Sequence, residues 1–468
     1  MSIIKNGSSI ALSQGVVALS SLVRNIIIAR IISPENFGVA SLFALLITFL
    51  EMMSGMSIER QIVQCRVEGL KDFIGTVHLL EIVRGCLLSL GIFLVADLYA
   101  SWFNLSDLGW AFKMLAIVPL LKGFINWDIA KQQRDMLFVN TALVDSIPQI
   151  ITVLISYPLA IYFNDYRVVL YILIFQVFIN VTLTHILSKQ RYYISLNFNC
   201  IKRVFGFGWP LLLNGFLIFL VFQTDRMIIG KVFSLEMLGY FSAAFAMTIM
   251  PSIVIAKIYS IVFLPILSRS QEQGQDEEPY VMLRMLHLTL LTGLYVLSFM
   301  ILFGGEVYIF AYGSEYFEGK VFMVLLGIMH SIRIIRIGPT IIATSRAQTK
   351  VIMKSNVVRS AAVLLSLCWI IMGGGIVGVL VIGIFGEISA LYYQVNRINY
   401  GSNDAYLKKA LNVLISIGVA IGISIYIYSA FFMIVTVIGF LIYLLFCSFC
   451  LLVWLYVFDS SVKFKNIF

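Results

Sequence analysis

The stretch Ile27–Gly38, IIARIISPENFG, has a counterpart 201 residues further along the chain, Ile228–Gly239, which is IIGKVFSLEMLG. Two isoleucines, a base (Arg30 or Lys231), a serine, a glutamate and a glycine occupy matching positions. Chance similarity between two helix ends is disfavoured, because the polar positions match as well as the apolar ones. The chain is therefore predicted to contain an internal repeat.

The composition indicates a protein that lies in lipid. Of its 468 residues 60% are hydrophobic and only 12% are charged, whereas a soluble domain is about 45–50% apolar and about 25% charged. A membrane-spanning helix needs roughly 20 mostly apolar residues. We therefore expect an all-α polytopic membrane protein with about 14 spans and short loops.

The expected spans are bounded by polar turns and by Gly and Pro. They are Ser9–Ile32, Phe37–Ile58, Phe73–Tyr99, Trp110–Asp128, Val139–Phe163, Val168–Leu187, Val204–Val232, Gly239–Leu267, Val281–Phe303, Val321–Thr344, Ile352–Met372, Ile376–Val395, Tyr406–Tyr428 and Phe431–Val457.

Basic residues are distributed unequally between the two sides that these spans define. About 19 lie on the side of the N-terminus and about 4 on the other, and cytoplasmic loops are the ones that collect Lys and Arg. Both termini are therefore predicted to be cytoplasmic. The net charge of +9 is explained by this asymmetry, and no nucleic-acid partner is expected.

The repeat divides the chain into two six-helix lobes, residues 1–200 and 201–400, followed by two additional transmembrane helices in residues 401–468. An even number of spans leaves both lobes in the same orientation, so this is a parallel pseudo-repeat about an axis along the membrane normal. A central cleft is expected between the lobes, opening to each side of the membrane in turn.

Ionisable residues inside spans are costly and usually face a cavity. The candidate bases for binding an anionic headgroup are Arg24, Arg30, Arg84, Arg226, Lys257, Arg333 and Arg336. The candidate acids, for coupling to an ion or for balancing charge, are Glu51, Glu81, Asp225 and Glu387. The repeat places Arg24 level with Asp225 and its neighbour Arg226. Because bases are in excess, an anion such as a phosphate is the natural guest.

Simpler roles remain open for several of these residues. Glu81 and Arg84, at positions i and i+3, are compatible with a structural pair within one helix. Arg30 and Lys231 are compatible with side chains that reach the outer interface. Arg333 and Arg336 are compatible with a place near a helix end. The acids are compatible with neutralising neighbouring bases rather than carrying an ion.

Several motifs resemble those of Wzx-type polysaccharide and O-antigen flippases, in the polysaccharide transporter family of the multidrug/oligosaccharidyl-lipid/polysaccharide exporter superfamily. The similarity is greatest to the colanic-acid-exporter-like subgroup and covers about residues 1 to 400. The motifs are RIISPENFG at 30–38, Arg84-Gly85, GFIN at 123–126 with Arg134, FGFGW at 205–209, QTDRMIIG at 223–230 with LGY at 238–240, and FLPILSR at 263–269.

The resemblance implies that the protein flips an undecaprenyl-pyrophosphate-linked oligosaccharide across the bacterial inner membrane. Its product would serve lipopolysaccharide O-antigen, capsule or exopolysaccharide synthesis. Members have a cationic cavity between two lobes, and the matching motifs carry Arg30, Asp225 and Arg226 into that cavity. The implied partners are the lipid-linked substrate, membrane lipids, a polysaccharide polymerase and a chain-length regulator.

No cofactor, metal or catalytic residue is expected, and H⁺ or Na⁺ is the candidate coupling ion. The chain has no GxxxxGK[ST] motif for ATP. Three alternatives remain open: a cation-coupled multidrug exporter of the same fold, a membrane polysaccharide polymerase or ligase, and a flippase for lipid II. The short outer loops argue against the enzyme, and the basic cleft argues against the drug exporter.

Overall fold

The computed structural model describes residues 2–56, 58–64, 70–135, 137–272 and 278–398. Within these ranges the regular elements are helices: α1 (Ser2–Ala29), α2 (Pro34–Ser54), α3 (Ile58–Gln64), α4 (Leu70–Trp102), η1 (Ser106–Leu108), α5 (Gly109–Met114), α6 (Ile117–Lys122), α7 (Asp128–Arg134), α8 (Phe138–Phe163), α9 (Arg167–Ile186), α10 (Phe198–Val232), α11 (Leu235–Glu272), α12 (Glu278–Tyr312), η2 (Ser314–Gly319), α13 (Lys320–Ser345), α14 (Thr349–Ile371) and α15 (Ile376–Arg397).

The all-α, multi-pass membrane fold is confirmed. Nine described segments are long and apolar enough to cross a membrane, and Ser13–Ala29 forms a shorter apolar helix. The two spans expected after residue 400 lie outside the described residues. The total of about 14 stays a prediction.

The fourth expected span, Trp110–Asp128, is two short helices, α5 and α6, instead of one. Pro119 lacks the N–H that would bond the carbonyl of Leu115 in a continuous α-helix. The backbone tightens there, and Leu115 and Ala116 bond carbonyls three residues earlier, at 3.2 and 3.0 Å.

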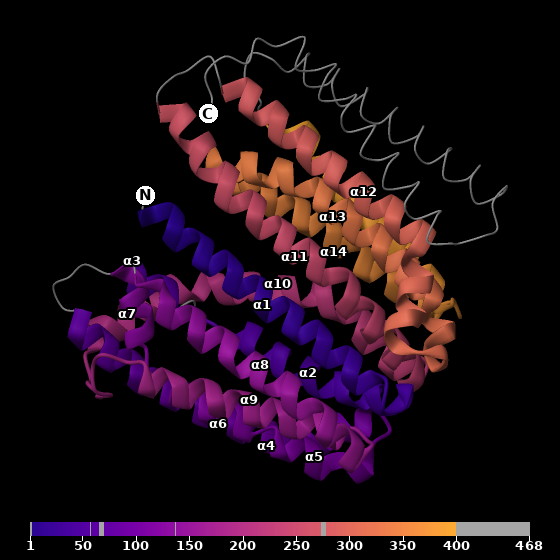
Figure 1. Cartoon of the computed structure of the whole chain (residues 1–468), viewed down its shortest axis with the longest axis horizontal. Coiled ribbons are helices and arrows are strands. Elements are labelled where there is room, and N and C mark those ends of the chain that lie inside the picture. The colour runs from indigo at the N-terminus through magenta and orange to yellow at the C-terminus, as the bar shows by residue number, and fades with distance from the viewer. Residues whose placement is uncertain (1, 57, 65–69, 136, 273–277, 399–468) are drawn as a thin grey trace.

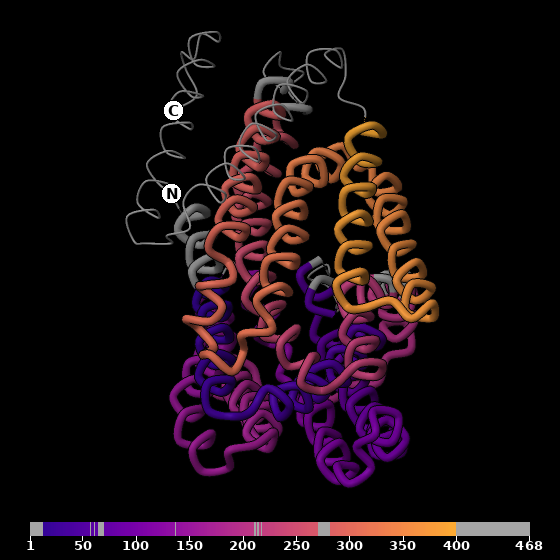
Figure 2. Tube along the Cα trace, turned by 90° about the vertical axis from the view of Figure 1, so that its right-hand side faces the viewer, coloured from indigo at the N-terminus to yellow at the C-terminus, as the bar shows by residue number. Residues whose placement is uncertain are grey.

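The described helices form two groups that lie side by side (Figure 1). Helices α1–α9 make one group, and α11–α15 make the other. The tube view in Figure 2 shows the indigo and purple segments mostly in the lower part of the view and the orange and gold segments in the upper part. We call these the N-terminal and C-terminal groups.

The two groups meet most closely where α2 crosses α11. A Cβ atom on Gly38 would lie 1.9 Å from the carbonyl oxygen of Leu235, and one on Gly239 would lie 1.9 Å from that of Pro34. These four residues are pairs related by the 201-residue repeat. Only glycine permits so close an approach, and the contact is reciprocal, as a pseudo-twofold axis through this point requires.

The bases of the repeat also cross between the groups. Arg30 donates from Nε to the carbonyl of Ala311, at 2.6 Å, and from Nη2 to that of Phe310. Lys231 donates to the carbonyl of Trp102, at 2.5 Å. Phe310 and Ala311 end α12, and Trp102 ends α4, so each base satisfies free carbonyls at a helix C-terminus of the other group. We use the name closed end for the region that contains the Arg30 and Lys231 contacts and the crossing of α2 and α11 at Gly38 and Gly239.

The segment that joins the two groups is held against the N-terminal one. The Asp128 carboxylate accepts hydrogen bonds from the backbone N–H groups of Lys189, at 2.7 Å, and Gln190, at 3.3 Å. His78 Nδ1 lies 2.8 Å from the Tyr193 carbonyl. The start of α10, which follows directly, is therefore fixed in position next to α3 and α4.

Helix α10 packs against both groups. A Cβ atom on Gly215 of α10 would lie 2.3 Å from the carbonyl oxygen of Met52 on α2. Gln61 of α3 donates a hydrogen bond to the carbonyl of Val204 on α10, at 3.4 Å. Further along, α10 contacts α11 and α14. The division of the chain at residue 200 stays a prediction, because α10 belongs to both groups by its contacts.

Substitution Gly38→Val should open the closed end, because the added carbons would overlap the backbone of α11. We expect a cysteine placed at the buried position Ala40, in a cysteine-free background, to react several-fold faster with a membrane-impermeant maleimide. Gly91→Val is the matched control, since no atom lies within 4 Å of a Cβ there. Equal labelling in both variants would show that the crossing does not hold this end shut.

Candidate functional site

Arg24, on α1, is surrounded by polar side chains of the N-terminal group. Its Nη1 donates to Gln176 Oε1 on α9 at 2.6 Å, and to Gln149 Oε1 and Thr152 Oγ1 on α8 at 3.2 and 3.3 Å. Gln149 and Thr152 are three residues apart and so share a face of α8. All these partners are neutral, and among the described residues no carboxylate pairs with Arg24. Its positive charge is uncompensated.

Arg226, on α10, is in a similar position in the other half of the repeat. Its Nη1 donates to Gln223 Oε1 at 3.2 Å, and its guanidinium lies 4.1 Å from the ring centroid of Phe245 on α11. The buried Nε has no hydrogen-bond partner. Within the described part of the chain no carboxylate pairs with Arg226 either. Each half of the repeat thus places one unneutralised guanidinium in its first helix.

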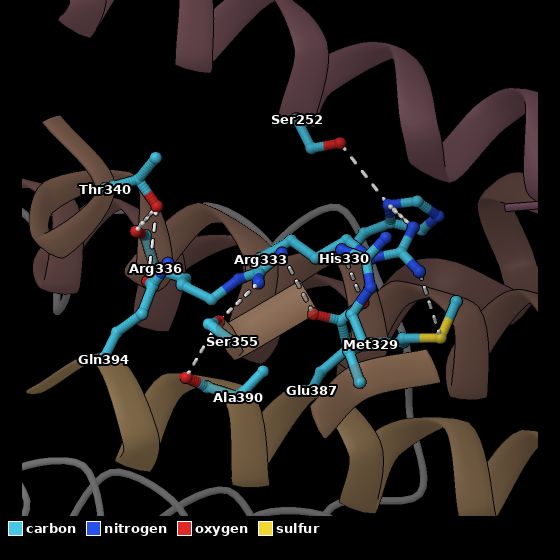
Figure 3. A network of polar contacts seen from close by, with 11 residues as sticks. Ser252, Met329, His330, Arg333, Arg336, Thr340, Ser355, Glu387, Ala390 and Gln394 are labelled. Carbon is cyan, nitrogen blue, oxygen red and sulfur yellow. Dashed lines mark hydrogen bonds and ion pairs between the residues drawn. The ribbon is translucent and has the colours of Figure 1, made fainter. Parts of the chain in front are cut away.

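Arg333 and Arg336 differ from these two, because both pair with Glu387 (Figure 3). Arg333 Nε lies 2.5 Å from Glu387 Oε1, and Arg336 Nη2 lies 3.5 Å from Oε2. The arginines are three residues apart on α13 and reach the same carboxylate on α15. Arg359 on α14 approaches Glu387 Oε1 to 3.4 Å. We call these four residues the Glu387 cluster.

The Glu387 cluster holds together three helices of the C-terminal group. Glu387 is 1% exposed, and a Cβ on the adjacent Gly386 would lie 2.6 Å from the Cβ of Ala362, so α14 and α15 are in close contact at this level. Phe222 of α10 packs against the guanidinium groups of Arg333 and Arg359, 4.6 and 4.7 Å from its centroid. The contacts of this cluster join helices of the protein to one another. Headgroup binding by Arg333 and Arg336 stays a prediction.

Asp225 lies next to this cluster without joining it. Its side chain lines a cavity of about 20 Å³ together with Arg333, Arg359 and Glu387, a space that would hold about one water molecule. Among the described residues no ion pair or hydrogen bond of the Asp225 carboxylate is found. Of the four predicted acids, it is the one without a direct basic partner.

The remaining predicted residues are placed as follows. Glu81 and Arg84 form an ion pair within α4, 2.8 Å apart, and Arg84 also donates to the Ser54 carbonyl at 3.3 Å. Glu51 pairs with Lys122 of α6. Lys257 of α11 is half-buried, and its charge interacts through space with Asp145 of α8.

The sequence-based prediction missed Arg359, Lys122 and Asp145. Arg359 and Asp145 lie seven and six residues inside the expected spans Ile352–Met372 and Val139–Phe163, so their depth was a signal that could have identified them. Lys122 was equally visible inside the expected span Trp110–Asp128.

Comparison with known proteins defines the family. The chain belongs to the polysaccharide biosynthesis protein family, whose model matches residues 27–320. It is 19% identical over 275 residues to an uncharacterised membrane protein in the cps region of Klebsiella pneumoniae. That match covers 58% of this chain and only 56% of the relative. The resemblance to the polysaccharide flippase family is thereby confirmed.

Two solved structures have a similar fold. The lipid II flippase MurJ in an inward closed conformation matches with a TM-score of 0.76 at 14% identity, over 98% of this chain and 99% of that one. An inward-facing multidrug resistance transporter of the MATE family matches with a TM-score of 0.61 at 12% identity, over 87% and 99%. At these identities the likeness defines the fold alone.

Replacement Glu387→Gln should destabilise the protein strongly, because three largely buried guanidinium groups would lose their shared carboxylate. Breaking a buried ion pair from one side costs about 3–5 kcal/mol, and we expect a clearly lower unfolding temperature in detergent. Glu306→Gln is the control, because its pair with Lys320 is half-exposed and exposed pairs contribute about 0–1 kcal/mol. Similar unfolding temperatures for both variants would contradict the structural role of the cluster.

Proposed function

We propose that this protein flips an undecaprenyl-pyrophosphate-linked oligosaccharide across the bacterial inner membrane for surface polysaccharide synthesis. The family supports a role in polysaccharide biosynthesis. The fold is shared with a protein named as a lipid II flippase. The distant relative is named for its place in a cps region. O-antigen, capsule and exopolysaccharide units all fit this class of substrate.

The observation that carries the proposal is the pair of unneutralised arginines, Arg24 and Arg226. A charge without a counter-ion at membrane depth is costly and is kept for a ligand of opposite charge. Guanidinium groups suit phosphate oxygens, since they can donate two parallel hydrogen bonds. A pyrophosphate offers two negative centres, and the two halves of the repeat offer one guanidinium each.

The mechanism we propose is alternating access without chemistry. The headgroup enters between the groups from the cytoplasmic side, while the closed end separates it from the periplasm. Pairing with Arg24 and Arg226 replaces the water that the pyrophosphate loses on entry. Separation of the glycine crossing and of the Arg30 and Lys231 contacts then releases the headgroup outward, and the polyprenyl tail stays in lipid throughout.

Coupling to H⁺ or Na⁺ is part of the proposal, and Asp225 is the preferred carrier. Glu51, Glu81 and Glu387 are each paired with a base, so their charges are already balanced. Asp225 is next to Arg226 in sequence and faces the small cavity beside the Glu387 cluster. A polymerase and a chain-length regulator are the partners that would receive the flipped unit.

A cation-coupled drug exporter is the second candidate, because MATE transporters share the fold. It would bind cationic, largely apolar compounds, for which free guanidinium groups are unfavourable. The family match and the two arginines both favour the anionic, lipid-linked substrate.

Removal of either unneutralised arginine should strongly reduce transport. In a strain deleted for the gene and complemented with Arg24→Ala or Arg226→Ala, we expect surface polysaccharide to fall at least about tenfold, the loss of a charge-assisted hydrogen bond or two. Lipid-linked oligosaccharide should accumulate in the inner membrane. Arg167→Ala is the control, since Arg167 pairs with Asp165 at the start of α9. Normal polysaccharide in both arginine variants, at equal protein levels, would refute the site.

A further inference from the structure

A stripe of polar residues runs along α8 on the face that meets α1. Asp145, Gln149 and Thr152 are spaced four and three residues apart and therefore lie on one side of the helix. Gln14 of α1 donates from Nε2 to Asp145 Oδ2 at 3.5 Å, and Arg24 donates to Gln149 and Thr152. The stripe lies within a helix that is mostly apolar.

The stripe has more hydrogen-bonding capacity than the protein uses. The Gln149 side chain accepts one hydrogen bond, from Arg24, and its amide N–H groups bond to no described residue. Asp145 has one long contact, to Gln14. Both side chains are half-buried and keep some accessible surface. Lipid cannot satisfy these groups, so their spare capacity calls for water or a polar ligand.

Asp145 lies near enough to charged residues of two other helices to interact with them electrostatically. Its carboxylate interacts through space with Lys257 of α11, in the C-terminal group, and with Glu59 of α3. Gln149 and Asp145 are four residues apart, which is about 6 Å along the helix axis. The stripe therefore extends from Arg24 toward the first turns of α8 over roughly the width of one sugar ring.

We infer that Asp145 and Gln149, with Gln14, recognise the first sugar of the translocated headgroup, while Arg24 holds the pyrophosphate. Sugar hydroxyls both donate and accept hydrogen bonds, which an amide and a carboxylate can match. A bare pyrophosphate would gain nothing from Asp145, whose carboxylate is negative and accepts only. The stripe would thus distinguish loaded from unloaded lipid carrier. This inference rests on the proposed function.

The test uses the lipid-linked oligosaccharide that accumulates in the deletion strain, purified as the probe, and undecaprenyl pyrophosphate as the sugar-free probe. Binding of each to the full chain in detergent is measured for wild type, Asp145→Asn, Gln149→Leu and Arg24→Ala. We expect Asp145→Asn and Gln149→Leu to weaken binding of the loaded lipid by about three- to tenfold, the loss of a hydrogen bond or two. Asp145→Asn should bind the sugar-free lipid as wild type does. Gln149→Leu also removes a hydrogen-bond partner of Arg24, so it should lose clearly more affinity for the loaded lipid than for the sugar-free one.

Arg24→Ala should weaken the binding of both probes, which separates the pyrophosphate contact from the sugar contact. Thr182→Val is the matched control, because Thr182 is exposed and bonds only its own helix, at Phe178. Thermal unfolding shows whether each variant is folded. If Gln149→Leu does not fold, Gln14→Leu provides a second test of the same stripe.

Three outcomes would overturn the inference. In the first, both probes weaken equally in the α8 variants; in the second, neither changes; in the third, wild type binds the loaded lipid no more tightly than the sugar-free one. Two other results would contradict the proposed function itself. The deletion strain would accumulate no lipid-linked oligosaccharide, or the wild-type protein would bind neither probe.

Discussion

The close crossing of α2 and α11 is the contact on which the arrangement of the two halves depends. Gly38 and Gly239 each meet the backbone of the opposite helix, so neither can carry a side chain without moving its partner. Because the residues in contact are related by the repeat, the crossing has the same geometry when its two sides are exchanged. Arg30 and Lys231, eight residues before these glycines, bond backbone carbonyls of the opposite group in the same reciprocal way. The two glycines thus permit the close approach of α2 and α11, and the two bases stabilise it.

The intramembrane charges fall into two kinds once their partners are known. Most are balanced locally: Glu81 by Arg84, Glu51 by Lys122, and Glu387 by three arginines. These pairs tie neighbouring helices together and leave little charge to attract a ligand. Arg24 and Arg226 have only neutral or aromatic partners among the described residues. The proposed function therefore rests on the charges that the fold leaves unbalanced, and not on the overall excess of bases.

The sequence predicted the fold well because helix formation in lipid is local. Apolar length and polar breaks identify a span without knowledge of its neighbours, and the repeat identified Gly38 and Gly239 as equivalent. Pairing between distant helices is not local, and so the sequence did not indicate that Glu387 would face Arg333 and Arg359 or that Arg30 would reach α12. The broken fourth span depended on a single residue, Pro119, whose effect a hydropathy average hides.

Helix α10 contacts both groups of helices and also carries two of the candidate binding residues. Its first half lies against α2 and α3 of the N-terminal group, held there by the Asp128 and His78 contacts to the joining segment. Its second half carries Asp225 and Arg226 and places Phe222 against the Glu387 cluster. A movement of one group relative to the other must therefore bend or shift α10. The candidate ligand at Arg226 and the candidate ion at Asp225 lie on the one helix that cannot stay fixed in both groups, so binding and rearrangement are mechanically connected.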